Sequence, residues 1–303
     1  MTNYSDRRFS FGEGIEYALK KLIFSDDIKS AFHADAQIIE CAVLKAISSF
    51  DPMLRSTFKN FSFNASYLDG IRIRLSNEFD MHVKIQLDCT LIPTSVPNRP
   101  GFIFLRASDS NDLKCVKYFD SEGYFVNRVA VQRWFLDNIT AVLPKLQNIC
   151  CNSGRAYSLE YKAHGYGLAH TLLATEHHNP RRQISFDFVP VFVFEPHQWP
   201  RNQLKYPKGN HQWFAVPCQY FDRSETHDPR SFIQCAPRWE HLVPHKKQNI
   251  KDSLCLLKAL RNANEMPGLA NYHLKSIYLQ ATDEKLANWN QAPGRILIRV
   301  SKF

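Results

Sequence analysis

The hydrophobic period changes four times along the chain, and this alternation restricts the fold more than any other feature of the sequence. Stretches with the spacing of an amphipathic helix alternate with stretches that have the two-residue period of half-buried strands. Helices are expected over residues 13–24, 35–49, 129–148 and from 250 onward, and strands over 61–92, around 155–175 and over 184–194. A proline-rich polar stretch, 195–237, separates the last strand from the last helices. The order predicts an α+β fold whose two lobes meet near residue 195.

The length and the charge of the chain limit the classes of protein to which it can belong. The chain has 303 residues, enough for one large domain or two lobes, and its formal net charge of +9 favours a polyanionic partner: nucleic acid, nucleotide phosphates or an anionic membrane face. The most apolar run, Ile184–Phe194, is too short to span a bilayer, and the polar start does not resemble a signal peptide. Eight scattered cysteines without a C-x-x-C pair favour reduced thiols in a cytosolic or nuclear protein, and we expect a cytoplasmic one.

The sharpest local motif is Glu78-Phe79-Asp80. Residues two apart on a strand project from the same face, so the two carboxylates repel each other unless cations lie between them. Hard divalent ions such as Mg²⁺ take oxygen ligands and supply that charge. A solvated pair on an edge strand is the more common explanation of this pattern taken alone.

A third acidic residue, Asp187, interrupts an otherwise apolar strand. An ionised carboxylate there is costly unless it is paired with an arginine or bound to a metal ion, and the physics favours neither explanation. If this strand lies beside the Glu78 strand, three carboxylates converge, which is a ligand set for two metal ions in phosphoryl transfer.

A short polar turn, Asn64-Ala65-Ser66, precedes the acidic strand. A serine in such a turn can offer its hydroxyl and backbone N–H groups to a phosphate, although an ordinary polar turn is the more common case.

The order of these pieces resembles that of cyclic GMP–AMP synthase and the cGAS-like receptors, a branch of the nucleotidyltransferase superfamily. Ala65-Ser66-Tyr67 through Glu78-Phe79-Asp80 is similar to the family's Gly-Ser turn, activation loop and Glu-x-Asp pair, and Ile184-Ser185-Phe186-Asp187 to its third carboxylate. The helix Lys251–Lys258 and the segment Asn271–Lys275 resemble two further family motifs.

The resemblance implies a bilobal nucleotidyltransferase fold: a core with a mixed sheet and N-terminal spine helices over residues 1–195, and a helical second lobe over 196–303, shortened or with a divergent ending. It implies that Glu78, Asp80 and Asp187 hold two Mg²⁺ or Mn²⁺ ions and that Asp187 helps to deprotonate the attacking ribose hydroxyl. The resemblance also implies that Ser66 contacts the triphosphate, that Lys258 contacts phosphate and that Tyr272 stacks on a base. A solvated helix face for Lys258 and a half-buried helix aromatic for Tyr272 are the simpler structural alternatives.

The chain departs from the family pattern at several positions. Ala65 stands where the family has glycine, and Glu240 and Leu242 stand where it has the arginine and serine expected to contact the base. The zinc insertion of the vertebrate DNA sensor is absent between Pro244 and Lys251, as in insect-type receptors, several of which respond to double-stranded RNA.

Basic residues concentrate on the N-terminal helices and the approach to the serine turn. They are Lys20, Lys21, Lys29, Lys45, Arg55 and Lys59. The resemblance implies that such a basic surface takes the nucleic-acid activator, which would be read by backbone and shape. The solvated face of amphipathic helices is the competing explanation.

The resemblance, together with the three acids and the basic N-terminal helices, therefore implies a double-stranded-RNA-activated enzyme that makes a cyclic dinucleotide from ATP and GTP. As a family member it would act in innate immunity, and its product would reach a STING-type receptor. A catalytically weak nucleic-acid-binding relative and a synthetase of linear oligonucleotides remain alternatives, because the first fits the departures and the second uses the same three acids.

Overall fold

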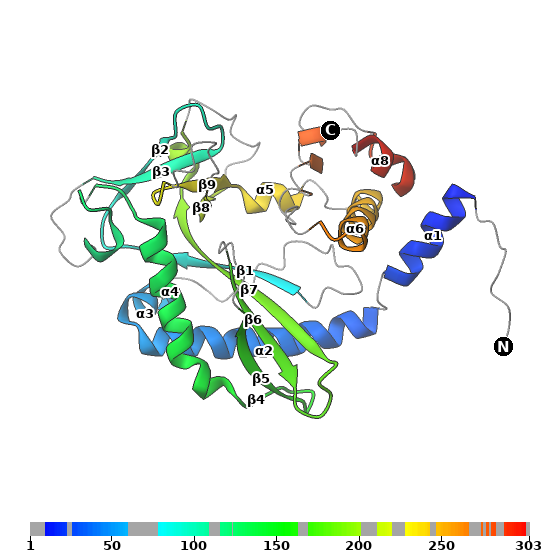
Figure 1. Cartoon of the computed structure of the whole chain (residues 1–303), viewed down its shortest axis with the longest axis horizontal. Coiled ribbons are helices and arrows are strands. Elements are labelled where there is room, and N and C mark those ends of the chain that lie inside the picture. The colour runs from blue at the N-terminus through cyan, green and yellow to red at the C-terminus, as the bar shows by residue number, and fades with distance from the viewer. Residues whose placement is uncertain are drawn as a thin grey trace. The chain divides into compact units, whose positions relative to one another are not determined.

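A computed structural model describes most of the chain (Figure 1). The described residues are 10–22, 26–59, 78–108, 116–122, 124–162, 169–200, 211–219, 228–242, 247–266, 274, 277–278, 280–282 and 288–300. They fall into two compact units, one within residues 1–29 and 240–303 and the other within 30–66 and 77–239. No helix in the described ranges is long and apolar enough to cross a bilayer.

The fold is mixed α+β, as predicted, with a large, mostly antiparallel sheet and flanking helices. The helices are α1 (Phe11–Leu22), α2 (Asp26–Phe50), α3 (Pro52–Lys59), α4 (Arg128–Val142), α5 (Pro237–Leu242), α6 (Gln248–Ala263) and α8 (Pro293–Val300), with 3-10 turns at Val116–Tyr118, Leu143–Leu146 and Pro196–Gln198. The strands are β1 (Glu78–Ile85), β2 (Leu91–Ser95), β3 (Phe102–Ala107), β4 (Ile149–Cys150), β5 (Ala156–Lys162), β6 (His170–Glu176), β7 (Gln183–Phe194), β8 (Trp213–Pro217) and β9 (Phe232–Cys235).

The sheet is built around its longest strand, β7. Its order is β2-β3-β9-β8-β7-β6-β5-β4, with every neighbouring pair antiparallel, and β1 joins β7 in parallel. A parallel pair cannot be closed by a hairpin, so the chain between β1 and β7 returns through β2 to β6 and α4. The sheet is therefore mixed, as expected, and β1 is its one parallel addition among the described strands.

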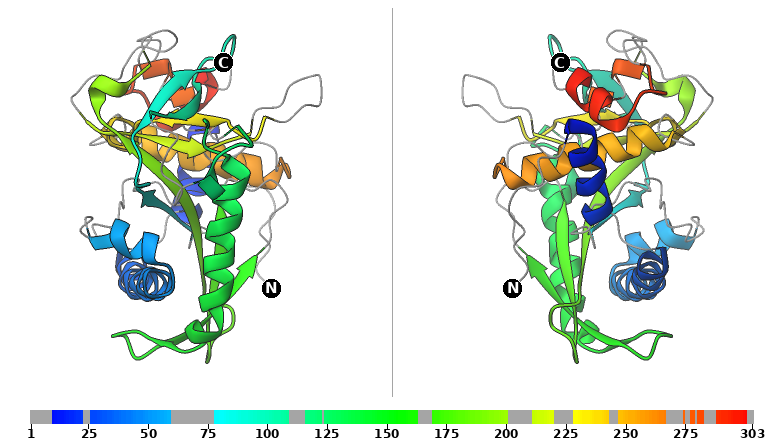
Figure 2. Two further views of the ribbon diagram at one scale, coloured as in Figure 1. Left: turned by 90° about the vertical axis from the view of Figure 1, so that its left-hand side faces the viewer. Right: turned by 90° about the vertical axis from the view of Figure 1, so that its right-hand side faces the viewer.

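One face of the sheet is covered by helices. Phe79 of β1 stacks on Phe186 of β7, and the ring of His33 in α2 lies edge-on to Phe79 at 5.9 Å between centroids. Phe135 of α4 packs on His170 of β6 from the same side of the sheet. Figure 2 shows α2 end-on while α4 runs upright, so the two helices cross at a steep angle.

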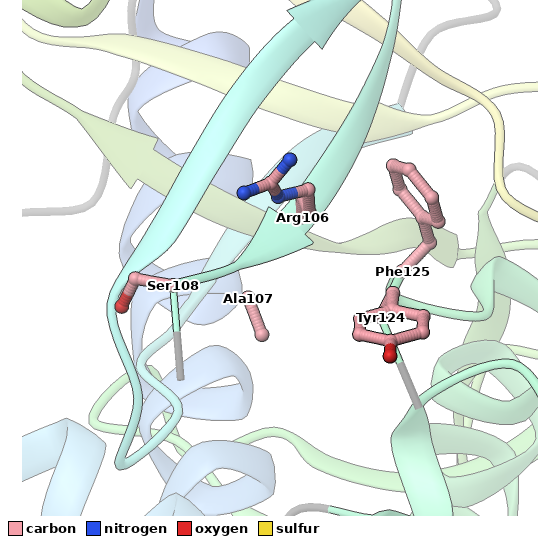
Figure 3. Close-up of a pocket in the computed structure, with 5 residues that line it drawn as sticks. All are labelled: Arg106, Ala107, Ser108, Tyr124 and Phe125. Carbon is pink, nitrogen blue, oxygen red and sulfur yellow. The ribbon is translucent and has the colours of Figure 1, made fainter. Parts of the chain in front are cut away.

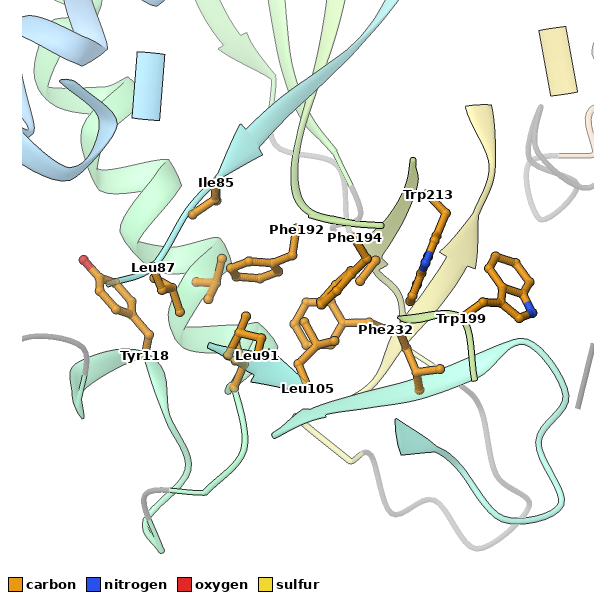
Figure 4. Close-up of a cluster of buried hydrophobic side chains, with 14 residues drawn as sticks. Ile85, Leu87, Leu91, Leu105, Tyr118, Phe192, Phe194, Trp199, Trp213 and Phe232 are labelled. Atoms are coloured by element: carbon orange, nitrogen blue, oxygen red, sulfur yellow. The ribbon is translucent and has the colours of Figure 1, made fainter. Parts of the chain in front are cut away.

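One large apolar core lies where β1, β2, β3, β7, β8 and β9 meet α4 (Figure 4). Phe194 stacks on Trp213, and Phe192 meets Phe232 edge-on. Burial of this much aromatic surface is a main source of stability for the sheet unit, because each large ring removes 150–250 Å² from water.

The junction of α2, α3 and α4 is fixed by one aspartate. Asp51 Oδ1 accepts from the backbone N–H groups of Met53 and Leu54, which makes it the N-cap of α3, and Pro52 occupies the first helical position. Asp51 Oδ2 accepts from the indole Nε1 of Trp134 in α4 at 2.9 Å. The predicted end of the second helix before Asp51 thus coincides with the observed end of α2 at Phe50.

The helical unit has its own core. Leu254 and Cys255 of α6 pack with Ile296 and Val300 of α8 and with Tyr278. Ser253 Oγ and the hydroxyl of Tyr278, both buried, lie 2.7 Å apart and satisfy each other. This is the helical part that the sequence placed from residue 250 onward.

The segment expected to be a polar connection contains two strands. β8 pairs with the end of β7, and β9 pairs with both β8 and β3, so the sheet extends past residue 195. The sheet unit accordingly continues to residue 239, and the helical unit takes residues 1–29 as well as 240–303. Both strands are short and flanked by prolines, which hid their two-residue alternation. The expected strand at Ile71–Arg74 lies outside the described residues.

Candidate functional site

The acidic positions meet at the parallel pairing of β1 with β7. In this register Asp80 is the partner of Asp187, and Glu78 is the partner of Ser185. Neighbouring strands lie about 4.8 Å apart, and residues in register share a face of the sheet. The backbone therefore places all three acidic positions on one face, the face opposite Phe79 and Phe186. The side chains of Glu78 and Asp80 themselves lie outside the described part of the structure.

Asp187 is half-buried and held by a neighbouring strand. Its Oδ1 accepts a hydrogen bond of 2.6 Å from Oγ1 of Thr171, which is its register partner on β6. Alternation on β7 buries Phe186 and Phe188 on the other face, so the carboxylate projects away from the helical layer. The alternative explanation, a salt bridge between Asp187 and an arginine, has no counterpart among the described ion pairs.

The same face of the sheet also carries a buried apolar cluster with two basic side chains beside it. His82 lies edge-on to the Phe214 ring at 5.4 Å, and Lys84 Nζ lies 5.6 Å from the centre of that ring. Burial lowers the pKa of Lys84. Val191 and Cys235 pack with Phe214 in a small buried cluster on this face. The acidic positions therefore lie on the same sheet face as a second apolar cluster, with His82 and Lys84 beside it.

Some predicted binding residues are not described, and one belongs to the other unit. Ser66 and Tyr272 lie outside the described residues. Lys258 lies on α6, half-buried, in the helical unit. Glu240, at the position where the resemblance expects an arginine, is only 6% exposed in α5.

The predicted nucleic-acid-binding residues are divided between the two units. Lys20 and Lys21 are exposed in the last turn of α1, and Lys45 is exposed on α2. Arg55 is exposed as well, but its guanidinium donates to the carbonyls of Ser48 and Ser49 at the end of α2. Such contacts satisfy helix C-terminal carbonyls, which gives Arg55 a structural role. Lys29 and Lys59 lie on helices, in α2 and α3, with side chains that are not described.

A pocket of about 280 Å³ lies elsewhere, at the end of β3 (Figure 3). Arg106, Ala107, Ser108, Tyr124 and Phe125 line it, so it contains none of the predicted site residues. Among the side chains that the structure describes, which exclude Glu78 and Asp80, no three His, Cys, Asp or Glu groups converge. The carboxylate site therefore rests on the β1–β7 register and on the described environment of Asp187.

Comparison with known proteins decides the family. Residues 67–228 match the Mab-21 protein nucleotidyltransferase domain, a segment that contains β1 to β8. A cyclic GMP-AMP synthase-like receptor of Drosophila eugracilis is 44% identical, with 99% of this chain and 82% of the relative aligned. The chain belongs to the cGAS-like receptors of the Mab-21 nucleotidyltransferase family. The cyclic GMP-AMP synthase-like protein of Drosophila melanogaster is 33% identical over 93% of this chain and 78% of its own length. The cyclic GMP-AMP synthase-like receptor of Aethina tumida is 26% identical over 84% and 67%.

Membership in the cGAS-like receptors confirms the resemblance that the sequence motifs indicated. Nucleotidyltransferases of this family typically use divalent metal ions, and carboxylate oxygens are the donors that such ions prefer. Thr171 is the member of the site environment that the motifs did not indicate. A threonine in a strand has no signature of its own, and only the pairing of β6 with β7 brings it to Asp187.

Proposed function

We propose that the chain is a metal-dependent nucleotidyltransferase that joins ATP and GTP into a cyclic dinucleotide. The observation that supports this most strongly is the register of β1 and β7, which makes Asp80 and Asp187 partners on adjacent parallel strands. Acidic positions this close are unfavourable without a cation, and two divalent ions would offset the repulsion.

The donor set fits such ions. Glu78, Asp80 and Asp187 would supply carboxylate oxygens, and the described carboxylate, Asp187, is half-buried and held in place by a hydrogen bond. Two Mg²⁺ or Mn²⁺ ions bound there would lower the pKa of an attacking hydroxyl and neutralise the charge of the triphosphate and of its pyrophosphate leaving group.

The remaining roles follow the family motifs. Asp187 helps to take the proton from the attacking ribose hydroxyl, Ser66 and Lys258 bind phosphate oxygens, and Tyr272 stacks on a base. We place the activity in the cytoplasm, with a STING-type receptor as the reader of the product. A cytosolic fraction of expressing cells without the cyclic dinucleotide would contradict that placement.

We further propose double-stranded RNA as the activator. The lysines of α1 and α2, Lys20, Lys21, Lys29 and Lys45, together with Lys59, supply charge for an A-form backbone, whereas Arg55 is already engaged with the end of α2. RNA binding should weaken steeply with salt, and each lysine that contacts phosphate should contribute about 0.9 to the log–log slope. A slope that is unchanged after Lys20→Ala, Lys21→Ala and Lys45→Ala are combined would contradict this surface.

A single assay tests the reaction. Pure protein receives radiolabelled ATP and GTP, Mg²⁺ or Mn²⁺, and a panel of double-stranded RNA, double-stranded DNA and single strands. We expect product only with RNA duplexes, and none from Asp80→Ala or Asp187→Asn. Asp88→Ala is the matched control, because Asp88 is an exposed acid just beyond the end of β1.

Each alternative has its own outcome. Linear products on chromatography would identify an oligonucleotide synthetase. Tight RNA binding without product in any condition would identify a catalytically weak relative. Equal activity of the wild-type and Asp80→Ala proteins would show that the carboxylate site takes no part in the reaction.

A further inference from the structure

The described environment of Asp187 contains one polar side chain that the family motifs do not account for. Thr171 Oγ1 lies 2.6 Å from Asp187 Oδ1, and the two residues are register partners on the antiparallel strands β6 and β7. A distance of this length is typical of a hydroxyl that donates to an ionised carboxylate. Among the described residues, Oδ1 receives this hydrogen bond and Oδ2 receives none.

The hydroxyl is held rigidly. Thr171 is only 6% exposed, and its branched β-carbon restricts rotation about χ1. On the opposite face, Leu172 of β6 and Phe186 of β7 are fully buried, so neither strand can shift without disturbing the core. The donor is thus fixed relative to the carboxylate before any ligand binds.

The pairing of β1 with β7 explains why the orientation of the Asp187 carboxylate needs this hydrogen bond. Asp187 lies beside the position of Asp80, and like charges on neighbouring strands repel each other. Without the hydrogen bond from Thr171, this repulsion would favour rotation of the Asp187 carboxylate away from Asp80. The hydrogen bond to Oδ1 opposes this rotation and leaves Oδ2 available for a cation.

We propose that Thr171 is a positioning residue that orients Asp187 so that Oδ2 is presented to a divalent metal ion. The inference rests on the proposed metal-dependent reaction. Hydrogen bonds to metal-ligating carboxylates typically change metal affinity by 10–100-fold when they are removed.

The test measures binding of Mn²⁺ alone, by the loss of the free-ion signal in electron paramagnetic resonance. Thr171→Val keeps the shape of the side chain and removes the donor, so its Mn²⁺ dissociation constant should rise about tenfold or more. Thr171→Ser restores the hydroxyl and should bind Mn²⁺ nearly as the wild type does. Thr175→Val is the matched control, because Thr175 lies on the same strand and face and its hydroxyl accepts a long, 3.5 Å hydrogen bond from Gln183.

The outcomes separate this inference from the proposed function. If Asp187→Asn weakens Mn²⁺ binding but Thr171→Val leaves it unchanged, the positioning role is wrong and the carboxylate site stands. If neither Asp187→Asn nor Asp80→Ala changes Mn²⁺ binding, both proposals fail. Thermal unfolding in EDTA checks that each variant is folded, and Thr171→Ala replaces the valine variant if that protein does not fold.

Discussion

Arg182 donates from Nη2 to Oδ2 of Asp35 over 3.1 Å and thereby ties the start of β7 to helix α2. The same guanidinium donates from Nε to the Tyr157 hydroxyl and lies over the ring of Phe32 at 3.8 Å. Asp35 is almost fully buried and also accepts from Ser153 and Tyr157. Burial opposes its ionisation, but these hydrogen bonds and the charge of Arg155 outweigh that effect and hold the pKa of Asp35 below its usual value.

Replacing this buried acid should cost much stability. Asp35→Ala removes one of the two buried carboxylates beside the Arg182 guanidinium, the other being Glu176 at 3.6 Å. It also leaves the Tyr157 hydroxyl without this acceptor. We expect a loss of about 3–5 kcal/mol in the free energy of unfolding at pH 7. Because the native pKa of Asp35 is lowered, the difference from wild type should shrink as the pH falls below about 4. Urea unfolding at several pH values measures both effects. Asp137→Ala, an exposed helical aspartate, is the control, and equal losses in the two variants would contradict the prediction.

A buried glutamate on α2 should give the opposite pH dependence. Burial raises the pKa of Glu40 from 4.5 to about 7. Since the unfolded chain loses this proton at lower pH than the folded chain, stability from this group is greatest below pH 4.5 and falls until about pH 7. Glu40→Gln should therefore be more stable than wild type at pH 8, by up to about 3 kcal/mol, and equal to it near pH 4. Thermal unfolding at both pH values checks this, with Glu16→Gln on the exposed side of α1 as the control.

His170 should stay neutral in mildly acidic solution. Burial lowers its pKa from 6.5 to about 4. Its Nε2 lies 2.6 Å from Oε1 of Gln132, an acceptor, so Nε2 carries the hydrogen and Nδ1 faces the Tyr161 hydroxyl. The unfolded chain binds the proton first, so the stability contributed by neutral His170 is present above pH 6.5 and is lost toward pH 4. NMR of the ring proton between pH 7.5 and 4 measures this directly, and a midpoint near 6.5 would contradict it.

The hydroxyl pair in the helical unit should be coupled. Tyr278→Phe leaves the buried Ser253 hydroxyl without its partner, which we expect to cost about 1–3 kcal/mol. Adding Ser253→Ala removes the unsatisfied group, so the double variant should lose less than the sum of the two single variants. A double-mutant cycle in urea measures the coupling, and strictly additive losses would show that the two hydroxyls do not interact.

The sequence points to three acidic residues but not to the way in which their strands pair. Glu78 and Asp80 are two residues apart and were placed on one strand face by alternation alone, and Asp187 stood out as an acid in an apolar run. Which strand lies beside which depends on pairing between segments far apart in the chain. Only the structure shows that β7 is the parallel partner of β1, with Asp80 opposite Asp187.

Other features left no local signal. β8 and β9 are short, and flanking prolines concealed their alternation, so the sheet extends beyond the predicted boundary at residue 195. Asp35 resembled any polar residue near the start of a helix, because its four partners come from β5 and the adjacent turns. Thr171 was missed for the same reason, since its importance depends on the strand that pairs with it.

The parallel pairing of β1 with β7 also determines when the site can form during synthesis of the chain on the ribosome. In the described chain the strand partner of β1 is β7, which a ribosome completes roughly a hundred residues later, on the order of ten seconds at ordinary elongation rates. Until then the segment with Glu78 and Asp80 lacks its neighbour on the sheet. A nascent receptor therefore acquires its three acidic positions together, only after most of the sheet has been synthesised, and a chain truncated before β7 carries no assembled site.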